Sequence, residues 1–579
     1  MSVTNMSKET NLKEEKDLVK EGIEIVFSHR ESFIVVSLTG RTGSGCTTVA
    51  EILKEDFDIK KFPTISSPPK NNEDRKDNII FNWTKKNWKK FNCIQVSQII
   101  LLLGLEEEKS KFFEFIGKES PKIEDFNELI NDFDLHHEKA ILANKTLKNI
   151  KTSSDEDISK SVKFIFECLP EYHHKVKKVL GYNYTKIFQL MGDNIRKSGS
   201  VIRDQPNPSK ILILPEKIHR IIKLVRYNHK NKNNYFVIDA LRHPFEIRYL
   251  RERISALYVV AVSTDEENRS KRLYAKGFDK EEIESLDQKE YPLEKDPKSQ
   301  EKQGYNSFVS QNIQACLELA DIHIRNNETD NNHFVELRKN IYRYIALMQH
   351  PGLITPTNIE RCMQIAHSLK LNSGCISRQV GAVVTDKDFS VKAVGWNDVP
   401  RGQVSCNLRN TSQAIRAEDK VAYSEFEIKN DNFRKNLISI ENKENEDGYI
   451  NGRNTAYCFK SLYNKTKGDN NQVHTRALHA EENAFIQISK YGGSGLEGGF
   501  LFSTASPCEL CAKKSYQIGI KKIVYIDPYP GITRPHIIAV GNKKPEFELF
   551  SGAIGRAYHE LYEPIMPYKD ELKGLLISQ

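Results

Sequence analysis

Short apolar runs and amphipathic stretches alternate along the first 350 residues. The run "FIVVSLT" (33–39) leads through "GRTGSGCTT" into the helical pattern "VAEILKE", and similar apolar runs stand at "YFVIDA" (235–240) and "ALYVVAV" (256–262). Strands separated by helical segments in this way predict an α/β domain with a parallel sheet. The stretch from about 60 to 185, rich in Lys, Asn and Glu, predicts a helical insertion in that domain.

A helical pattern over 333–349 closes this first part, and "HPGLITPTN" (350–358), with two prolines and a glycine, marks a boundary. We therefore expect two domains, over 1–345 and 351–579. The second has the order helix, strand, strand, helix, strand, helix, strand, in the segments "NIERCMQIAHSLKLN", "QVGAVVTD", "SVKAVGWN", "HAEENAFIQISKYG", "GFLFSTAS", "CELCAKKSYQIG" and "KKIVYID". This order predicts a three-layer α/β/α domain in which two helices begin at His-x-Glu and at Cys-x-x-Cys.

Composition narrows the class of protein. Of 579 residues, 39% are apolar and 28% charged, and no run approaches eighteen consecutive apolar residues, so we expect neither a membrane span nor an export signal. Ten irregularly spaced cysteines form no disulfide framework and favour a reducing, cytoplasmic location. The net charge of +8 permits nucleic-acid binding without arguing for it.

The chemistry is concentrated in "ALHAEENAF" (477–485) and "TASPCELC" (504–511). One imidazole and two thiolates, here His479, Cys508 and Cys511, are a known ligand set for catalytic zinc, which keeps its fourth position for water. Glu481 can reach that water without binding the metal. Zinc lowers the pKa of its water from about 15.7 to about 7, and the carboxylate can pass the proton to a ring nitrogen and a leaving amine. We predict a hydrolytic zinc site with Glu481 as its acid–base residue.

Two other interpretations of Cys-x-x-Cys stay open, a redox pair and half of a structural zinc site. The accompanying His-x-Glu, the proline before Cys508 and the matching strand–helix order favour the catalytic site.

Over about 355–535 the chain resembles the cytidine and deoxycytidylate deaminase superfamily. "CISRQVGAVVTD", "HAEENA", "SPCELCAKKSYQIGIKKIVYI" and "DPYPG" resemble its deoxycytidylate branch, whereas "GWNDVP" departs from that branch's Gly-Tyr-Asn-Gly-Thr-Pro. The resemblance implies that Asn397 contacts the sugar, Arg378 lies near the phosphate and Tyr529 closes over the base. A turn asparagine, a surface arginine and a core tyrosine are the alternatives.

Cys375, Cys406, Cys458 and His474 raise the question of a second zinc site, which some members of this branch have. Buried free cysteines are the equal alternative, and the sequence does not separate the two.

In the first domain, "GRTGSGCT" (40–47) fits the phosphate-binding pattern G-x-x-x-x-G-K-[ST], except that Cys46 replaces the lysine. Gly40, Gly43, Gly45 and Thr47 could still hold a nucleoside triphosphate with Mg²⁺. With "VIDALRHPFEIRYLRE", where Asp239 is either a metal-organising carboxylate or an ordinary helix cap, this part resembles the P-loop nucleotide kinases. We expect it to bind a nucleotide without phosphorylating it, a structural relic being the alternative.

Together the two parts resemble the bacterial anti-phage dCTP deaminases. The resemblance implies a P-loop kinase-like domain followed by a zinc-dependent deaminase that converts dCTP and dCMP to dUTP and dUMP, starving a phage of deoxycytidine nucleotides. It further implies a homo-oligomer restrained by a regulatory nucleotide or an inhibitory RNA. A housekeeping dCMP deaminase, a nucleic-acid-editing deaminase and a regulatory protein with a structural zinc are the alternatives.

Overall fold

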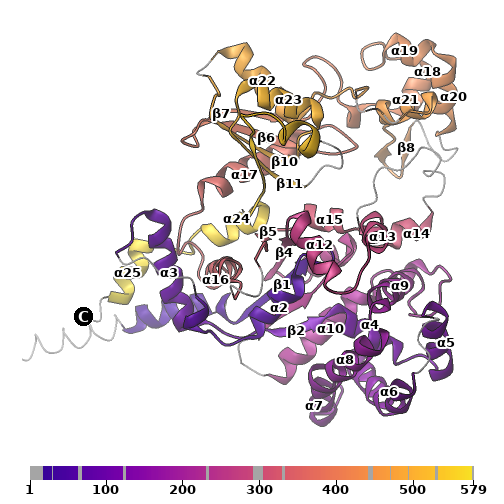
Figure 1. Cartoon of the computed structure of the whole chain (residues 1–579), viewed down its shortest axis with the longest axis vertical. Coiled ribbons are helices and arrows are strands. Elements are labelled where there is room, and N and C mark those ends of the chain that lie inside the picture. The colour runs from indigo at the N-terminus through magenta and orange to yellow at the C-terminus, as the bar shows by residue number, and fades with distance from the viewer. Residues whose placement is uncertain are drawn as a thin grey trace, which may run out of the picture. The chain divides into compact units, whose positions relative to one another are not determined.

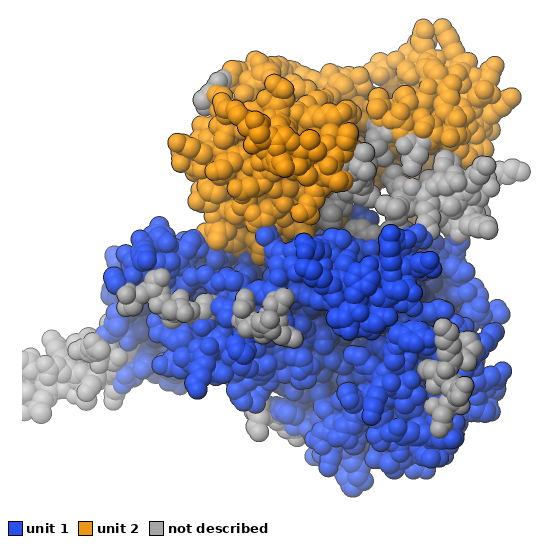
Figure 2. All heavy atoms as spheres, viewed as in Figure 1, with its two compact units in different colours: residues 1–291, 304–355, 556–579 blue, residues 292–303, 356–555 orange. Residues whose placement is uncertain are grey.

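The computed structural model divides the chain into two compact units (Figure 2). Unit 1 comprises the described residues of 1–291, 304–355 and 556–579, and unit 2 those of 356–555. The predicted second domain extended to residue 579, whereas residues 556–579 pack within unit 1. The structure describes residues 17–28, 30–62, 68–120, 126–229, 234–290, 304–328, 333–440, 448–469, 471, 473–492, 495–527 and 533–576.

A parallel sheet forms the centre of unit 1, as the sequence predicted (Figure 1). Its strands are β1 (Phe33–Thr39), β2 (Asn92–Gln95), β3 (Asn234–Asp239), β4 (Leu257–Ser263) and β5 (Ile322–Arg325), in the spatial order β5-β4-β1-β3-β2. Each neighbouring pair is parallel. Because helices cover both faces, β1 is buried at every residue after Phe33 and reads as a continuous apolar run.

The predicted helical insertion is largely helical, but it contains the edge strand β2 and its helices continue beyond 185. Four residues with polar ends, "NCIQ", carry too little pattern to predict a strand. The helices of the insertion are α3 (Asn72–Asn87), α4 (Val96–Gly104), α5 (Lys109–Glu119), α6 (Asn127–Lys148), α7 (Asp155–Lys163), α8 (Leu169–Leu180), α9 (Asn183–Ser198) and α10 (Ile213–Asn228). All of these helices except the first, α3, share one apolar core with β1 and β3.

The remaining helices of unit 1 connect or flank the strands. They are α2 (Cys46–Lys54), α11 (Pro244–Arg251), α12 (Glu266–Tyr274), α13 (Lys280–Glu290), α14 (Tyr305–Val309), α15 (Ile313–Glu318), α16 (Val335–Gln349), α24 (Gly555–Tyr562) and α25 (Tyr568–Leu576). The C-terminal helices belong here because His350 Nε2 lies 2.8 Å from the buried Glu571 Oε1, and Gly352 donates its backbone N–H to Leu561.

Unit 2 has a five-stranded mixed sheet in the order β12-β11-β10-β6-β7. The strands are β6 (Gly381–Thr385), β7 (Val391–Trp396), β10 (Phe500–Ala505), β11 (Lys522–Asp527) and β12 (Glu546–Leu549). Strands β6 and β7 pair antiparallel, and β10 is parallel to β11 and antiparallel to β6. A short strand β13 (Gly552–Ala553) follows.

Neighbouring residues of these strands enter different apolar cores, which makes the unit three-layered (Figure 1). Leu501 packs on the face covered by α22 (Ala480–Tyr491) and α23 (Glu509–Ile518), whereas Phe502 packs on the face covered by α17 (Asn358–Leu369). A capping box between Thr357 and Glu360 starts α17. The predicted order of helices and strands is therefore present.

Between β7 and α22 lies a helical insertion that the sequence analysis did not resolve. It contains α18 (Thr411–Arg416), α19 (Glu425–Lys429), α20 (Asp431–Ser439), the strand pair β8 (Tyr449–Ile450) and β9 (Arg453–Asn454), and α21 (Phe459–Lys467). Its separate core surrounds the fully buried Arg409, which pairs with Glu427 and lies over the rings of Tyr423 and Tyr457.

Among the helices that the structure describes, none combines the length and apolar character needed to cross a bilayer.

Candidate active site

The structure brings His479, Cys508 and Cys511 together at the helix N-termini of unit 2. His479 Nδ1 lies 3.3 Å from Cys508 Sγ and 3.4 Å from Cys511 Sγ. A tetrahedral zinc ion, with bonds of about 2.0–2.1 Å to nitrogen and about 2.3 Å to sulfur, holds such atoms about 3.5 Å apart. The three side chains therefore have the spacing of zinc ligands. Among the described residues, no other cluster of His, Cys, Asp or Glu has such spacing.

Local backbone structure places these ligands. His479 is the N-cap of α22, Cys508 is the N-cap of α23, and Cys511 lies in the first turn of α23. Helix α22 sits close to the sheet because Gly395 of β7 has no side chain: a Cβ there would lie 2.2 Å from the carbonyl oxygen of Ala480. Both motifs start helices, as predicted, so the positive helix ends favour thiolates.

The electrostatics of the cysteine pair suit a divalent cation. A hydrogen bond from Cys511, with further help from His479, lowers the pKa of Cys508 to about 4. The same contact and burial raise the pKa of Cys511. One proton is thus shared between two sulfurs that repel each other as thiolates. A zinc ion would supply the charge that allows both to ionise.

Glu481 lies beside this cluster, in the first turn of α22, and is buried. Ser503 Oγ, from β10, donates a hydrogen bond to Glu481 Oε1 over 3.1 Å. Burial raises the pKa of Glu481, the largest influence on it, and the charge of His479 opposes the rise. A raised pKa makes a carboxyl group better able to hold a proton between two transfers. Sequence analysis missed Ser503, because a strand serine carries no signal for this role.

Two of the three predicted substrate residues make hydrogen bonds or ion pairs within the chain. The Asn397 side chain holds the loop before β6: Oδ1 accepts from the Val380 N–H at 2.6 Å, and Nδ2 donates to the Arg378 carbonyl at 2.8 Å. The Arg378 guanidinium pairs with the buried Asp527 at the end of β11. These contacts fix the loop geometry, and the sugar and phosphate roles stay predictions. Tyr529 lies outside the described residues.

The four residues considered for a second zinc site do not form one cluster of ligand atoms among the described residues. Instead, Arg476 Nη1 donates to Cys406 Sγ at 3.6 Å, and the ring of His474 packs on Tyr463.

In unit 1 the glycine-rich loop lies at the carboxyl end of β1, beside the end of β3, where nucleotide sites form in parallel sheets. Gly45 has φ +103°, and a Cβ there would lie 2.0 Å from Asn326 Nδ2, so only glycine fits. Thr47 hydrogen-bonds to Asp239, the strand-end aspartate singled out in the sequence. Burial raises the pKa of Cys46 to about 12, so a neutral thiol stands where the pattern has a lysine.

A carboxylate of the same chain sits on this loop. Glu290, the last residue of α13 and fully buried, accepts the backbone N–H of Thr42 at 3.0 Å and pairs with Arg242 Nη1 at 2.7 Å. Neither Arg242 nor Glu290 was predicted as part of the loop, since the two meet it only through the fold.

Taken together, unit 2 brings three side chains into the spacing that zinc ligands have in catalytic sites, and a buried carboxylate lies beside them. Comparison with known proteins agrees. Residues 356–527 match the family model described as the cytidine and deoxycytidylate deaminase zinc-binding region, which supports zinc as the metal.

The chain is also similar to several known deaminases. Deoxycytidylate deaminase of Enterobacteria phage T2 is 29% identical over 167 residues, which are 29% of this chain and 78% of that protein. Its counterpart from phage T4 is 29% identical over 168 residues, 29% and 76% of the two chains. A solved dCMP deaminase of cyanophage S-TIM5, in complex with dCMP and dUMP, is 24% identical and covers 34% of this chain and 99% of its own, with a TM-score of 0.21.

Proposed function

We propose that unit 2 is a zinc-dependent deaminase of deoxycytidine nucleotides, converting dCTP and dCMP to dUTP and dUMP. The observation that carries the proposal is the buried Glu481 next to the His479, Cys508 and Cys511 cluster. A structural zinc site has four protein ligands and no need of an acid–base group. The family-model match over this region supports the same conclusion.

The reaction exchanges the C4 amino group of cytosine for oxygen: water adds to C4, and ammonia leaves. Zinc bound by these ligands supplies a hydroxide-like nucleophile at neutral pH. The Glu481 carboxylate would take one proton from the attacking water and hand it to the ring nitrogen. It would then take the remaining proton of the new C4 hydroxyl and give it to the amino group, so that C4=O forms as ammonia leaves. Ser503 holds the carboxylate in one orientation during these transfers.

Nucleotides are the proposed substrates because the similar phage proteins bear the name deoxycytidylate deaminase. Arg378 and Asn397 line the loop expected near the sugar and phosphate. In the proposal, Asn397 fixes the loop through Val380, while the Arg378 guanidinium, oriented by Asp527, supplies positive charge to a phosphate.

We extend the proposal to unit 1, whose loop of Gly40, Gly43, Gly45 and Thr47 would bind a nucleoside triphosphate with Mg²⁺ and no phosphoryl transfer. The neutral Cys46 supports binding without catalysis, because the cation that stabilises the transferred phosphate is missing. Consumption of dCTP during phage infection would then serve as antiviral defence, with unit 1 as the sensor.

The test is an assay of purified full-length protein with dCTP, dCMP, cytidine and single-stranded DNA, followed by chromatography of the uracil products. We expect dUTP and dUMP from the nucleotides, and no uracil in DNA. Product from DNA alone would replace the proposal with an editing deaminase, and product from dCMP alone would favour a housekeeping dCMP deaminase. Absence of any product from zinc-loaded protein would leave a structural zinc site.

A further inference from the structure

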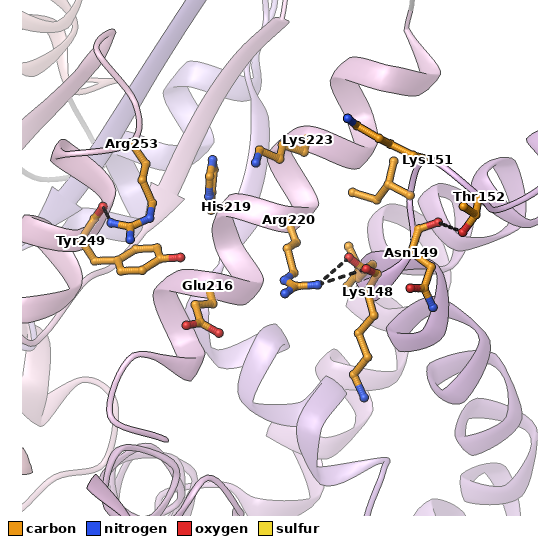
Figure 3. Close-up of a pocket in the computed structure, with 12 residues that line it drawn as sticks. Lys148, Asn149, Lys151, Thr152, Glu216, His219, Arg220, Lys223, Tyr249 and Arg253 are labelled. Carbon is orange, nitrogen blue, oxygen red and sulfur yellow. Dashed lines mark hydrogen bonds between the residues drawn. The ribbon is translucent and has the colours of Figure 1, made fainter. Parts of the chain in front are cut away.

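Unit 1 contains a hollow that involves neither the sheet edge nor the glycine-rich loop. It has a volume of about 530 Å³ and lies between three segments of the insertion and its neighbour (Figure 3). These are the end of α6 with the residues that follow it (147–152), one face of α10, and the end of α11 with Arg253. Figure 3 shows labelled side chains from all three segments around this hollow.

Positive charge dominates the lining. Five cationic side chains surround the hollow against one carboxylate, Glu216: Lys148, Lys151, Arg220, Lys223 and Arg253. Among the described residues, no carboxylate lies within ion-pair distance of the three lysines. Arg220 Nη1 donates to the carbonyl oxygen of Leu147 at 3.2 Å, which holds its guanidinium at the site. Several cations around one space attract an anion that carries several charges.

Aromatic and neutral groups form the other wall. The Arg253 guanidinium lies 3.6 Å from the centroid of the Tyr249 ring, and the rings of His219 and Tyr249 are 6.5 Å apart. Burial lowers the pKa of His219, and Lys223, Arg253 and Arg220 lower it further, which favours the neutral imidazole. A flat ring system can stack on the face of Tyr249 opposite the Arg253 guanidinium and hydrogen-bond to a neutral imidazole.

We propose that this hollow binds a nucleoside triphosphate. The lysines and Arg220 would take the phosphates, and Tyr249 with His219 would take the base. The volume fits a small ligand, since such pockets span about 300–1,000 Å³.

A nucleic-acid strand suits the site less well, because the basic surface does not continue. The first turn of α7 is acidic, with Asp155, Glu156 and Asp157, and Glu252 stands next to Arg253. A strand leaving the hollow in these directions would bring its phosphates toward carboxylates, whereas a mononucleotide would not.

Equilibrium dialysis of the full-length protein with radiolabelled ATP tests the proposal by counting sites per chain. The charge-reversal variant Lys148→Glu/Lys223→Glu should bind ATP at one site fewer, or about a hundredfold more weakly at that site, because each reversal replaces an attraction with a repulsion. The control Lys118→Glu/Lys186→Glu changes the net charge equally at exposed lysines of α5 and α9 outside the hollow, and should bind as the parent does. Hydrogen exchange with ATP should slow at 147–152, 216–223 and 249–253.

A second variant separates base from phosphate. Tyr249→Leu should weaken ATP binding at this site while leaving tripolyphosphate binding unchanged. Equal binding of ATP by the parent and the charge-reversal variant, or no change of exchange in these segments, would overturn the proposal. Lysine-dependent binding of a single-stranded RNA oligonucleotide that excludes ATP would replace it with a nucleic-acid surface.

Discussion

The two motifs that stand out in the sequence form sites of different completeness in the folded chain. In unit 2, His479, Cys508 and Cys511 converge at two helix ends with Glu481 beside them, and every part of the proposed chemistry is in reach. In unit 1, the glycine-rich loop keeps its shape, but Cys46 is neutral and Glu290 occupies part of the loop. The glycine-rich loop thus has the backbone shape of a phosphate-binding loop without the lysine charge. In the His479, Cys508 and Cys511 cluster, the same side chains supply both the geometry and the charge.

The largest effect is expected from loss of a thiolate in unit 2. Cys508→Ser or Cys511→Ser should abolish zinc binding and deamination together and lower the thermal stability of unit 2, because the metal joins two helix starts. Metal analysis of the purified variants, with a thermal melt, measures both. Cys375→Ser is the matched control and should keep its zinc; loss of one zinc equivalent from this variant would show that the ligand set is incomplete.

Removal of the acid–base group comes next. Glu481→Gln should keep its zinc and lose about 10²–10⁴-fold in kcat, since the amide cannot carry the proton. The neighbouring Glu482→Gln, whose parent side chain is half-buried and pairs with Lys514, should stay close to the parent in kcat. Near-parent turnover by a zinc-loaded Glu481→Gln protein would remove the distinction drawn between the two units.

The ion pair of Arg378 with Asp527 is a structural contact of unit 2, and Arg378 is also proposed to bind phosphate. Arg378→Met leaves Asp527 buried without its guanidinium and should destabilise the unit by about 2–3 kcal/mol, below the usual cost of breaking a fully buried pair because Arg378 is partly exposed. Urea unfolding measures this loss, and Arg378→Met/Asp527→Asn should regain part of it. A rise in KM for dCMP in the stable double variant would support the phosphate contact; an unchanged KM would make Arg378 purely structural.

The smallest expected effect is on the ATP affinity of the glycine-rich loop in unit 1. Cys46→Lys restores the cation that the loop lacks and should tighten ATP binding there about tenfold, the gain expected from one charge-assisted phosphate contact. Isothermal titration in Mg²⁺ buffer reports the change, with Cys168→Lys as a control for added charge at another half-buried cysteine of unit 1. Unchanged affinity would mean that the loop holds no phosphate, and the relic interpretation would take over.

Local sequence pattern alone predicted much of the fold and of the candidate site in unit 2. The helix and strand order of 358–527 and the start of two helices at the metal ligands depend on period, caps and spacing over a few residues, and these survive folding. The order β5-β4-β1-β3-β2 and the contact of Ser503 with Glu481 depend on which strands become neighbours. The helical insertion around Arg409 was missed because its pattern is short and broken by polar residues, although its core is closed by one buried cation.

Glu290 would compete with a phosphate for the groups of the glycine-rich loop. Its carboxylate accepts the Thr42 N–H and engages Arg242, so an incoming phosphate must take both groups from a partner on the same chain. A tethered competitor acts at an effective concentration on the order of millimolar, however dilute the protein is. A nucleotide would therefore bind this loop more weakly than it would bind a loop without the carboxylate, by a factor that does not depend on protein concentration. If the loop binds a nucleotide as proposed, the concentration at which it fills is set by how tightly α13 holds its last residue in position.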